Sequence, residues 1–160
     1  MPVRMSEADR VRRAERARVF IANIRLYGQL HCPLCDQPID HNKLVSVNHI
    51  IARSAGGDRK DFSNFMPTHP GCNSRKCNLS IYQVFGSEAV ARVDAYRMAV
   101  NGRLTEADHQ AAMLIFKAEP NWAQRIEAIY DWVHLGLLPM PPSSPMHHTA
   151  SNGGTYAARS

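Results

Sequence analysis

Residues 32–77 read CPLCDQPIDHNKLVSVNHIIARSAGGDRKDFSNFMPTHPGCNSRKC and contain all four cysteines of the 160-residue chain. Cys32 and Cys35 are separated by two residues, and a turn of this length lets two thiolates reach one tetrahedral ion. His69 and Cys72 repeat the same spacing, which predicts a structural zinc site of the Cys3His type. Because so small a core has little apolar mass, zinc would supply folding free energy directly, about 10 kcal/mol or more.

The fourth zinc ligand has an alternative, because Cys77 also lies at a permitted sequence distance from Cys72. We favour His69, since Cys77 would follow Cys72 along a helix, where positions five apart point in different directions. Two disulfides, or a set of unrelated buried thiols, would explain the cysteines without a metal. The two-residue spacing and the lack of a secretion-signal pattern favour the metal site.

A second group of chemically useful residues lies between and beside the two halves of this predicted zinc site. In chain order it consists of Asn48-His49 at the end of a β-branched stretch, Gly56-Gly57, Asn64, Cys72-Asn73 and Lys76. Each element alone is common. Their order and spacing together with the cysteine pairs are specific, and over residues 32–77 the chain resembles an HNH nuclease of the ββα-metal type.

The resemblance implies roles for several of these residues. His49 would be the general base that activates water for phosphodiester hydrolysis, since a free imidazole has a pKa of about 6.5. Asn73 would be a catalytic residue that binds one divalent ion, Mg²⁺ or another cation such as Mn²⁺, and Asn48 would be its second protein ligand. Asn64 would hold the loop by hydrogen bonds so that His49 faces the phosphate, with an ordinary turn asparagine as the alternative.

Two departures from the family pattern bear on these roles. Asn48 stands where the family often has Asp, and two neutral amides hold Mg²⁺ more weakly than a carboxylate does. A DNA phosphate would then help to hold the metal, or a transition ion of higher affinity would replace it. His69 stands where the family usually has Cys, a mild change because zinc accepts either.

The charge distribution suits a polyanionic partner. The chain has a net charge of +5, and its first 30 residues hold seven arginines against three acidic residues. We expect Arg53, Arg75 and Lys76 to contact the nucleic acid. For Arg75 and Lys76, ordinary charge on a helix surface is an equal alternative.

Helical periodicity, caps and β-branched runs predict the elements around the nuclease core. We expect helices over 6–28, 72–85, 87–100, 104–118 and 120–135, and strands over 43–50 and 65–68. Ser87 is the expected N-cap of the third helix, and Pro120 is expected in the first turn of the last. Apolar residues of the last two helices are interpreted as core, with a homodimer face as the alternative.

The fold class is therefore α+β, with a small zinc-stapled ββα core and helical flanks. Four segments are expected: a basic N-terminal helix (1–30), the nuclease core (31–86), a helical extension (87–138) and a disordered Pro-, Ser- and Gly-rich tail (139–160). No apolar run is long enough to span a membrane. We expect a soluble, cytoplasmic protein of a bacterial or phage-infected cell.

The first functional hypothesis is a DNA endonuclease, and the second is a non-catalytic zinc module that binds nucleic acid. Asn48 keeps the second hypothesis open, whereas His49, Asn64 and Asn73 together favour the first. A zinc-stabilised protein-interaction domain is a third reading. The sequence leaves open the DNA target, the choice between a nick and a double-strand cut, and a homing, restriction or phage-packaging role.

Overall fold

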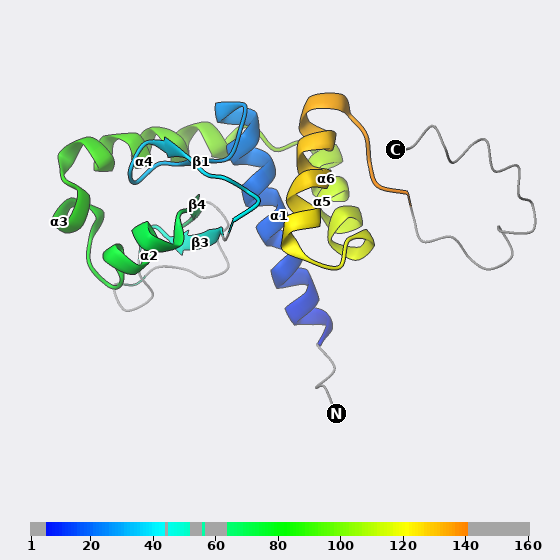
Figure 1. Cartoon of the computed structure of the whole chain (residues 1–160), viewed down its shortest axis with the longest axis horizontal. Helices are drawn as coiled ribbons and strands as arrows, with labels where there is room; N and C mark the ends of the chain where they lie inside the picture. The colour runs from blue at the N-terminus through cyan, green and yellow to red at the C-terminus, as the bar shows by residue number, and fades with distance from the viewer. Residues whose placement is uncertain (1–5, 44, 52–55, 57–63, 141–160) are drawn as a thin grey trace, which may run out of the picture.

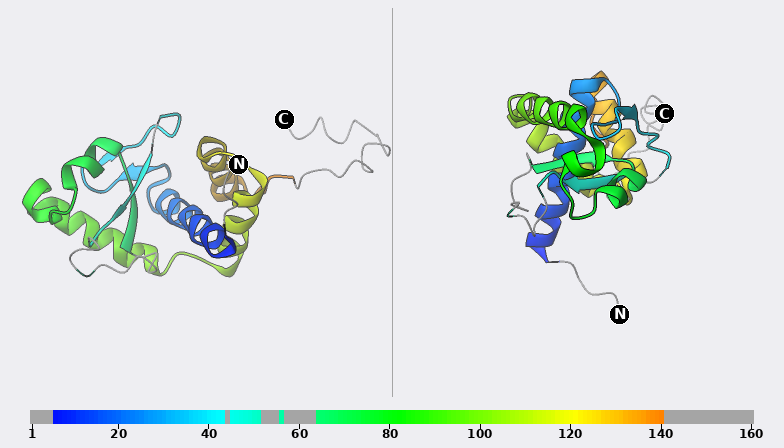
Figure 2. Two further views of the ribbon diagram at one scale, coloured as in Figure 1. Left: turned by 90° about the horizontal axis from the view of Figure 1, so that it is seen from below. Right: turned by 90° about the vertical axis from the view of Figure 1, so that its left-hand side faces the viewer.

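A long N-terminal helix, α1 (Glu7–Tyr27), lies between the two halves of the fold (Figure 1). The computed structural model describes residues 6–43, 45–51, 56 and 64–140, so Arg53 and the expected tail from residue 141 onward lie outside the described residues. One half contains β1 (His31–Cys32), β2 (Gln37–Pro38), β3 (Ser46–His49), β4 (Phe65–Thr68), α2 (Pro70–Lys76), α3 (Ile81–Phe85) and α4 (Ser87–Asn101). The other half contains α5 (Glu106–Ala118) and α6 (Trp122–Leu135). The left view of Figure 2 shows the same arrangement from below.

The described strands form two separate antiparallel hairpins. β1 and β2 pair around the CPLC turn. β3 pairs with β4, with Asn48 opposite Met66 and His49 opposite Phe65. Because α2 begins directly after β4, the order β3, β4, α2 is a ββα unit. The predicted α+β class is confirmed, although β3 is shorter than the strand expected over 43–50.

The prediction of one helix over 72–85 is wrong, because the structure has two helices, α2 and α3, separated by a turn. The turn begins at Cys77, whose φ of 46° lies in the left-handed region and whose backbone N–H still bonds the carbonyl of Asn73. A non-glycine residue rarely adopts a positive φ, and this change of backbone direction ends α2 at Cys77. Ser80 then begins α3 through a reciprocal capping box with Gln83, a signal that apolar periodicity alone overlooks.

Two predicted helix starts are also wrong in detail. Ser87 does not cap α4 but is its first residue, and the N-cap position belongs to Gly86 at a φ of 86°. α6 begins after Asn121, whose side chain caps the first turn, so Pro120 precedes the helix. Gly136 ends α6 in the left-handed conformation, as glycine commonly does.

One hydrophobic core joins α1 to both halves of the fold. Its buried members include Ile24 on α1, Met66 on β4 and Ile129 on α6. Most apolar residues of α5 and α6 are therefore core, whereas Leu114 is 49% exposed. In the described part of the chain, every helix is too short or too polar to cross a membrane.

Asp108 fixes three helices relative to one another inside this core. Its buried carboxylate accepts hydrogen bonds from the guanidinium of Arg25 on α1, at 2.5 Å, and from the indole Nε1 of Trp132 on α6, at 2.9 Å. It also completes the predicted capping box with Thr105 at the start of α5. A buried carboxylate is tolerated when it is paired and hydrogen-bonded in this way.

Candidate metal centre and active site

The four predicted zinc ligands converge at the junction of the first hairpin and α2. The ligand atoms of Cys32, Cys35, His69 and Cys72 all lie within 4.8 Å of one another. Pro70 at the first position of α2 sets its start, which places His69 at the N-cap and Cys72 in the first turn. Cys77 is exposed and lies outside the cluster. All four cysteines are free thiols, so the disulfide alternative does not hold.

His69 is oriented as a metal ligand. Its Nε2 lies 3.0 Å from the carbonyl oxygen of Pro38. Because a carbonyl only accepts, Nε2 carries the ring proton, and the lone pair of Nδ1 faces the thiols. Nδ1 lies 3.3 Å from Sγ of Cys35 and 3.8 Å from Sγ of Cys72. A backbone carbonyl behind the imidazole is the usual outer partner of a metal-bound histidine.

The electrostatics of the cluster also suit a bound cation. Burial raises the pKa of the Cys32 thiol, and backbone hydrogen bonds only partly oppose this effect. Burial, together with the neighbouring Cys32 and Cys35, raises the pKa of Cys72 to about 12. Without a metal these sulfurs would stay protonated at neutral pH, whereas a divalent cation stabilises the thiolates. The Cys3His cluster therefore fits zinc.

Arg92 supports this metal centre from a distant part of the chain. From α4 its Nε donates to the carbonyl of Pro33 at 3.0 Å, and its Nη2 donates to that of Leu34 at 2.8 Å. These carbonyls belong to the CPLC turn between two cysteine ligands. Sequence reasoning missed Arg92, and no local pattern marks it as different from any other helix arginine.

The amides of Asn48 and Asn73 meet between β3 and α2. Asn48 is 4% exposed, and its Nδ2 donates to Oδ1 of Asn73. Oδ1 of Asn48 is buried and has no hydrogen-bond partner among the described residues. The orientation of an amide group is assigned from its hydrogen-bond partners. A rotation of the Asn48 amide by half a turn would place its Oδ1 beside Oδ1 of Asn73. The pair fits a hard divalent cation, which prefers oxygen ligands.

His49 follows directly at the end of β3. Its half-buried imidazole packs edge-on against the ring of Phe65, at 4.6 Å between ring centroids. Successive residues of a strand point to opposite faces, so Asn48 turns towards α2 while His49 lies beside Phe65. The structure thus brings Asn48 and Asn73 together and places the predicted base on the adjoining residue.

Asn64 is hydrogen-bonded to the two residues that directly follow β3. Its side-chain Oδ1 accepts from the backbone N–H of Ile51 at 2.9 Å, and its Nδ2 donates to the carbonyl of Ile51 at 3.1 Å. The backbone carbonyl of Asn64 also accepts from the N–H of Ile50 at 2.7 Å. These bonds tie Asn64 to Ile50 and Ile51, and its role in orienting His49 stays a prediction.

The predicted nucleic-acid contacts have different environments. Arg75 is exposed, with its guanidinium 4.8 Å from the ring centroid of Phe85, and its contact with DNA stays a prediction. Lys76 is 1% exposed, and its Nζ donates to the backbone carbonyl of His49 at 3.0 Å. This burial contradicts both readings of Lys76, as a phosphate contact and as a surface charge. Desolvation also lowers the pKa of Lys76.

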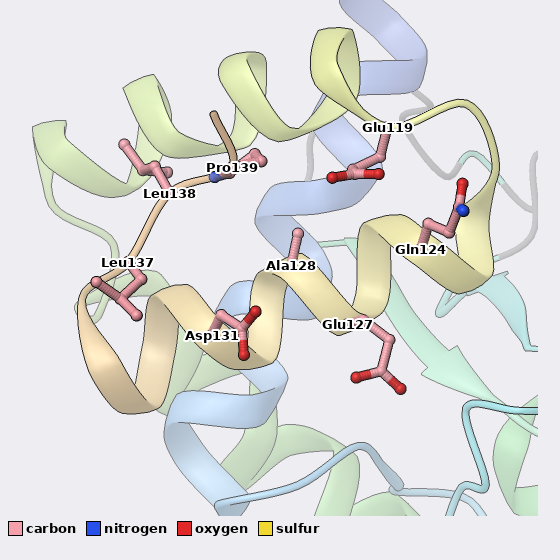
Figure 3. Close-up of a pocket in the computed structure, with 8 residues that line it drawn as sticks. All are labelled: Glu119, Gln124, Glu127, Ala128, Asp131, Leu137, Leu138 and Pro139. Carbon is pink, nitrogen blue, oxygen red and sulfur yellow. The ribbon is translucent and has the colours of Figure 1, made fainter. Parts of the chain in front are cut away.

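A separate pocket of about 180 Å³ beside α6 is acidic (Figure 3). Its walls include the carboxylates of Glu119, Glu127 and Asp131, with Leu137 at the end where the chain leaves the helix. In Figure 1, α1 stands between α6 and the β3–α2 unit. Negative charge repels a polyanion, so this surface is unsuited to a nucleic-acid backbone.

The described residues combine a ββα unit, a Cys3His cluster that could hold a metal ion, and histidine and asparagine at the junction of strand and helix. The family model for HNH endonuclease matches residues 32–79, which confirms the predicted resemblance for this segment of the chain. Comparisons with curated proteins and with solved structures found no match. The domain supports a nuclease-type function with a nucleic acid as substrate.

Proposed function

We propose that the protein is a metal-dependent DNA endonuclease that hydrolyses phosphodiester bonds, with His49 as the general base. The observation that carries this proposal is the junction of β3 and α2. There an amide of the strand contacts Asn73 on the helix, and a half-buried imidazole occupies the next position of the strand. This arrangement lies within the segment that matches the HNH endonuclease family model.

In the proposed reaction, His49 takes a proton from a water molecule whose oxygen attacks the phosphorus atom. The bond between phosphorus and the 3′ oxygen breaks, and that oxygen takes up a proton. The products are a 5′-phosphate and a 3′-hydroxyl. Asn64 keeps His49 facing the phosphate by holding the loop at Ile51.

Asn48 and Asn73 would hold the catalytic cation, Mg²⁺ or Mn²⁺. When bound, such a cation stabilises negative charge that develops on the phosphate oxygens. The buried and unpartnered Oδ1 of Asn48 supports this assignment. Because neither ligand is charged, we expect weak metal binding in the absence of DNA.

The Cys3His cluster would hold a structural zinc ion. With four protein ligands it leaves no open position for substrate, as in structural rather than catalytic zinc sites. Its location between the CPLC turn and α2 fixes the start of the helix that carries Asn73.

A second candidate function is nucleic-acid binding without cleavage. The observation in its favour is Asn48, an amide at a position where a carboxylate would bind a divalent cation more tightly. This function requires the zinc cluster and the basic residues but not His49.

A nicking assay on supercoiled plasmid with Mg²⁺ or Mn²⁺ tests the proposal. We expect His49→Ala to lower the rate by about 10²- to 10⁴-fold, the usual contribution of a general base. His134→Ala, at an exposed histidine in the last turn of α6, is the matched control and should nick like the wild type. Equal nicking by the wild type and His49→Ala would contradict the proposal, and DNA binding without nicking would favour the second function.

A further inference from the structure

We propose that Lys76 is a positioning residue for His49: its buried ammonium group holds the peptide carbonyl of His49 and thereby fixes the end of β3 against α2. This inference rests on the proposed nuclease function, in which His49 is the base. It assigns Lys76 a role other than contact with DNA.

The burial of Lys76 needs a physical reason. The side chain is 1% exposed, although lysine is rarely buried without a partner. No ion pair of the described residues includes Lys76. Burial of an unpaired ammonium is unfavourable for folding, so an apolar residue would suit this position better if stability alone mattered.

The hydrogen bond of Lys76 connects the two elements that carry the proposed chemistry. Nζ lies 3.0 Å from the carbonyl oxygen of His49, the last residue of β3. Lys76 also follows Asn73 by three residues on α2, and residues at this separation share a helix face. One lysine therefore sets how the strand with the base lies relative to the helix with the metal ligand.

A second contact holds the opposite edge of the same peptide group. The next residue, Ile50, donates its N–H to the carbonyl of Asn64 at 2.7 Å. Lys76 and Asn64 thus hold the carbonyl and the N–H of the one peptide group that joins His49 to Ile50. Since a displacement of about 1 Å can lower a rate by about a hundredfold, loss of one contact should reduce turnover.

The test is Lys76→Met, which keeps the unbranched side chain up to the ε position and removes the ammonium group. We expect kcat for plasmid nicking to fall at least tenfold, while KM and the Kd for DNA stay within twofold of the wild type. The melting temperature should be unchanged or higher, because an apolar group replaces a buried charge. Lys117→Met, at an exposed lysine of α5, is the matched control and should leave all four quantities unchanged.

Three results would overturn the inference. An unchanged kcat would show that the contact is dispensable. A higher Kd with a smaller salt dependence of DNA binding would show that Lys76 contacts phosphate after all. A lower melting temperature, with activity restored on cooling, would show a structural role only. Lys76→Arg keeps N–H donors, so it should recover part of kcat.

A measurement without DNA separates failure of this inference from failure of the proposed function. We expect the ¹³C chemical shift of the His49 carbonyl to change in Lys76→Met and not in Lys117→Met. Amide exchange of Ile50 should become faster in the same variant, since the end of β3 is released. An unchanged carbonyl shift overturns the inference even where the wild type cleaves, and a changed shift in a protein that never cleaves rejects the proposed function alone.

Discussion

Replacement of His69 by alanine is the sharpest perturbation of the metal centre. Nδ1 of His69 lies 3.3 Å from Sγ of Cys35 and 3.8 Å from Sγ of Cys72, so its loss removes one of four converging ligands. Structural zinc sites contribute about 10 to 16 kcal/mol. One ligand in four then accounts for roughly 3 kcal/mol, or about a hundredfold in zinc affinity.

The assay is a competitive zinc titration against a chromophoric chelator, combined with thermal unfolding followed by circular dichroism. Cys77→Ser is the matched control, because Cys77 is exposed and outside the cluster. We expect one zinc ion per chain and normal affinity in this control. The reasoning is refuted if His69→Ala binds zinc like the wild type, or if Cys77→Ser loses as much affinity as His69→Ala.

Three further predictions concern the metal ligands, the zinc turn and the helical core. Asn48→Asp should lower the Mg²⁺ concentration for half-maximal nicking by about tenfold, since a carboxylate binds a hard cation more tightly than an amide; an unchanged Mg²⁺ titration would remove Asn48 from the ligand set. Arg92→Ala should weaken zinc binding by about 10- to 100-fold in the same chelator titration, as the loss of outer hydrogen bonds commonly does. An unaltered zinc affinity would show that the CPLC turn keeps its conformation without Arg92. Asp108→Ala should lower the free energy of unfolding by about 3 to 5 kcal/mol in urea, because it leaves the Arg25 charge without its buried partner. A decrease of less than about 1 kcal/mol would contradict this account of the core. Burial alone would raise the pKa of Asp108, but hydrogen bonds from Thr105, Trp132 and Arg25 lower it below 3.8. The stabilisation from ionised Asp108 is therefore present above that pH and is lost as the pH falls through the lowered pKa. Asp108→Ala should lack this acid dependence of stability.

The metal centre could be predicted from the sequence because coordination geometry limits local spacing. Two residues between Cys32 and Cys35, and again between His69 and Cys72, suit a shared tetrahedral ion whatever the rest of the fold does. The preference for His69 over Cys77 followed from helix geometry. The structure gives a stronger reason, because α2 ends at Cys77, where φ turns positive at 46°.

The supports of the site could not be predicted, since they depend on packing between distant elements. Arg92 reaches the CPLC turn only because α4 packs beside it. Nothing in the local sequence pattern shows that β3 packs against the last turn of α2. Lys76 was therefore expected to be on the helix surface. The break between α2 and α3 was missed because the apolar pattern continues across it, although Ser80 and Gln83 form a capping box.

Chemical rescue of His49→Gly tests the general-base assignment most directly. The imidazole of His49 is only half-buried, so free imidazole from solution should enter the space that the substitution leaves. We expect added imidazole to raise the single-turnover nicking rate of His49→Gly in proportion to its concentration, with no such effect on Asn73→Ala. Wild-type nicking by folded His49→Gly without imidazole, or no response to imidazole, would contradict the assignment of this residue as the base.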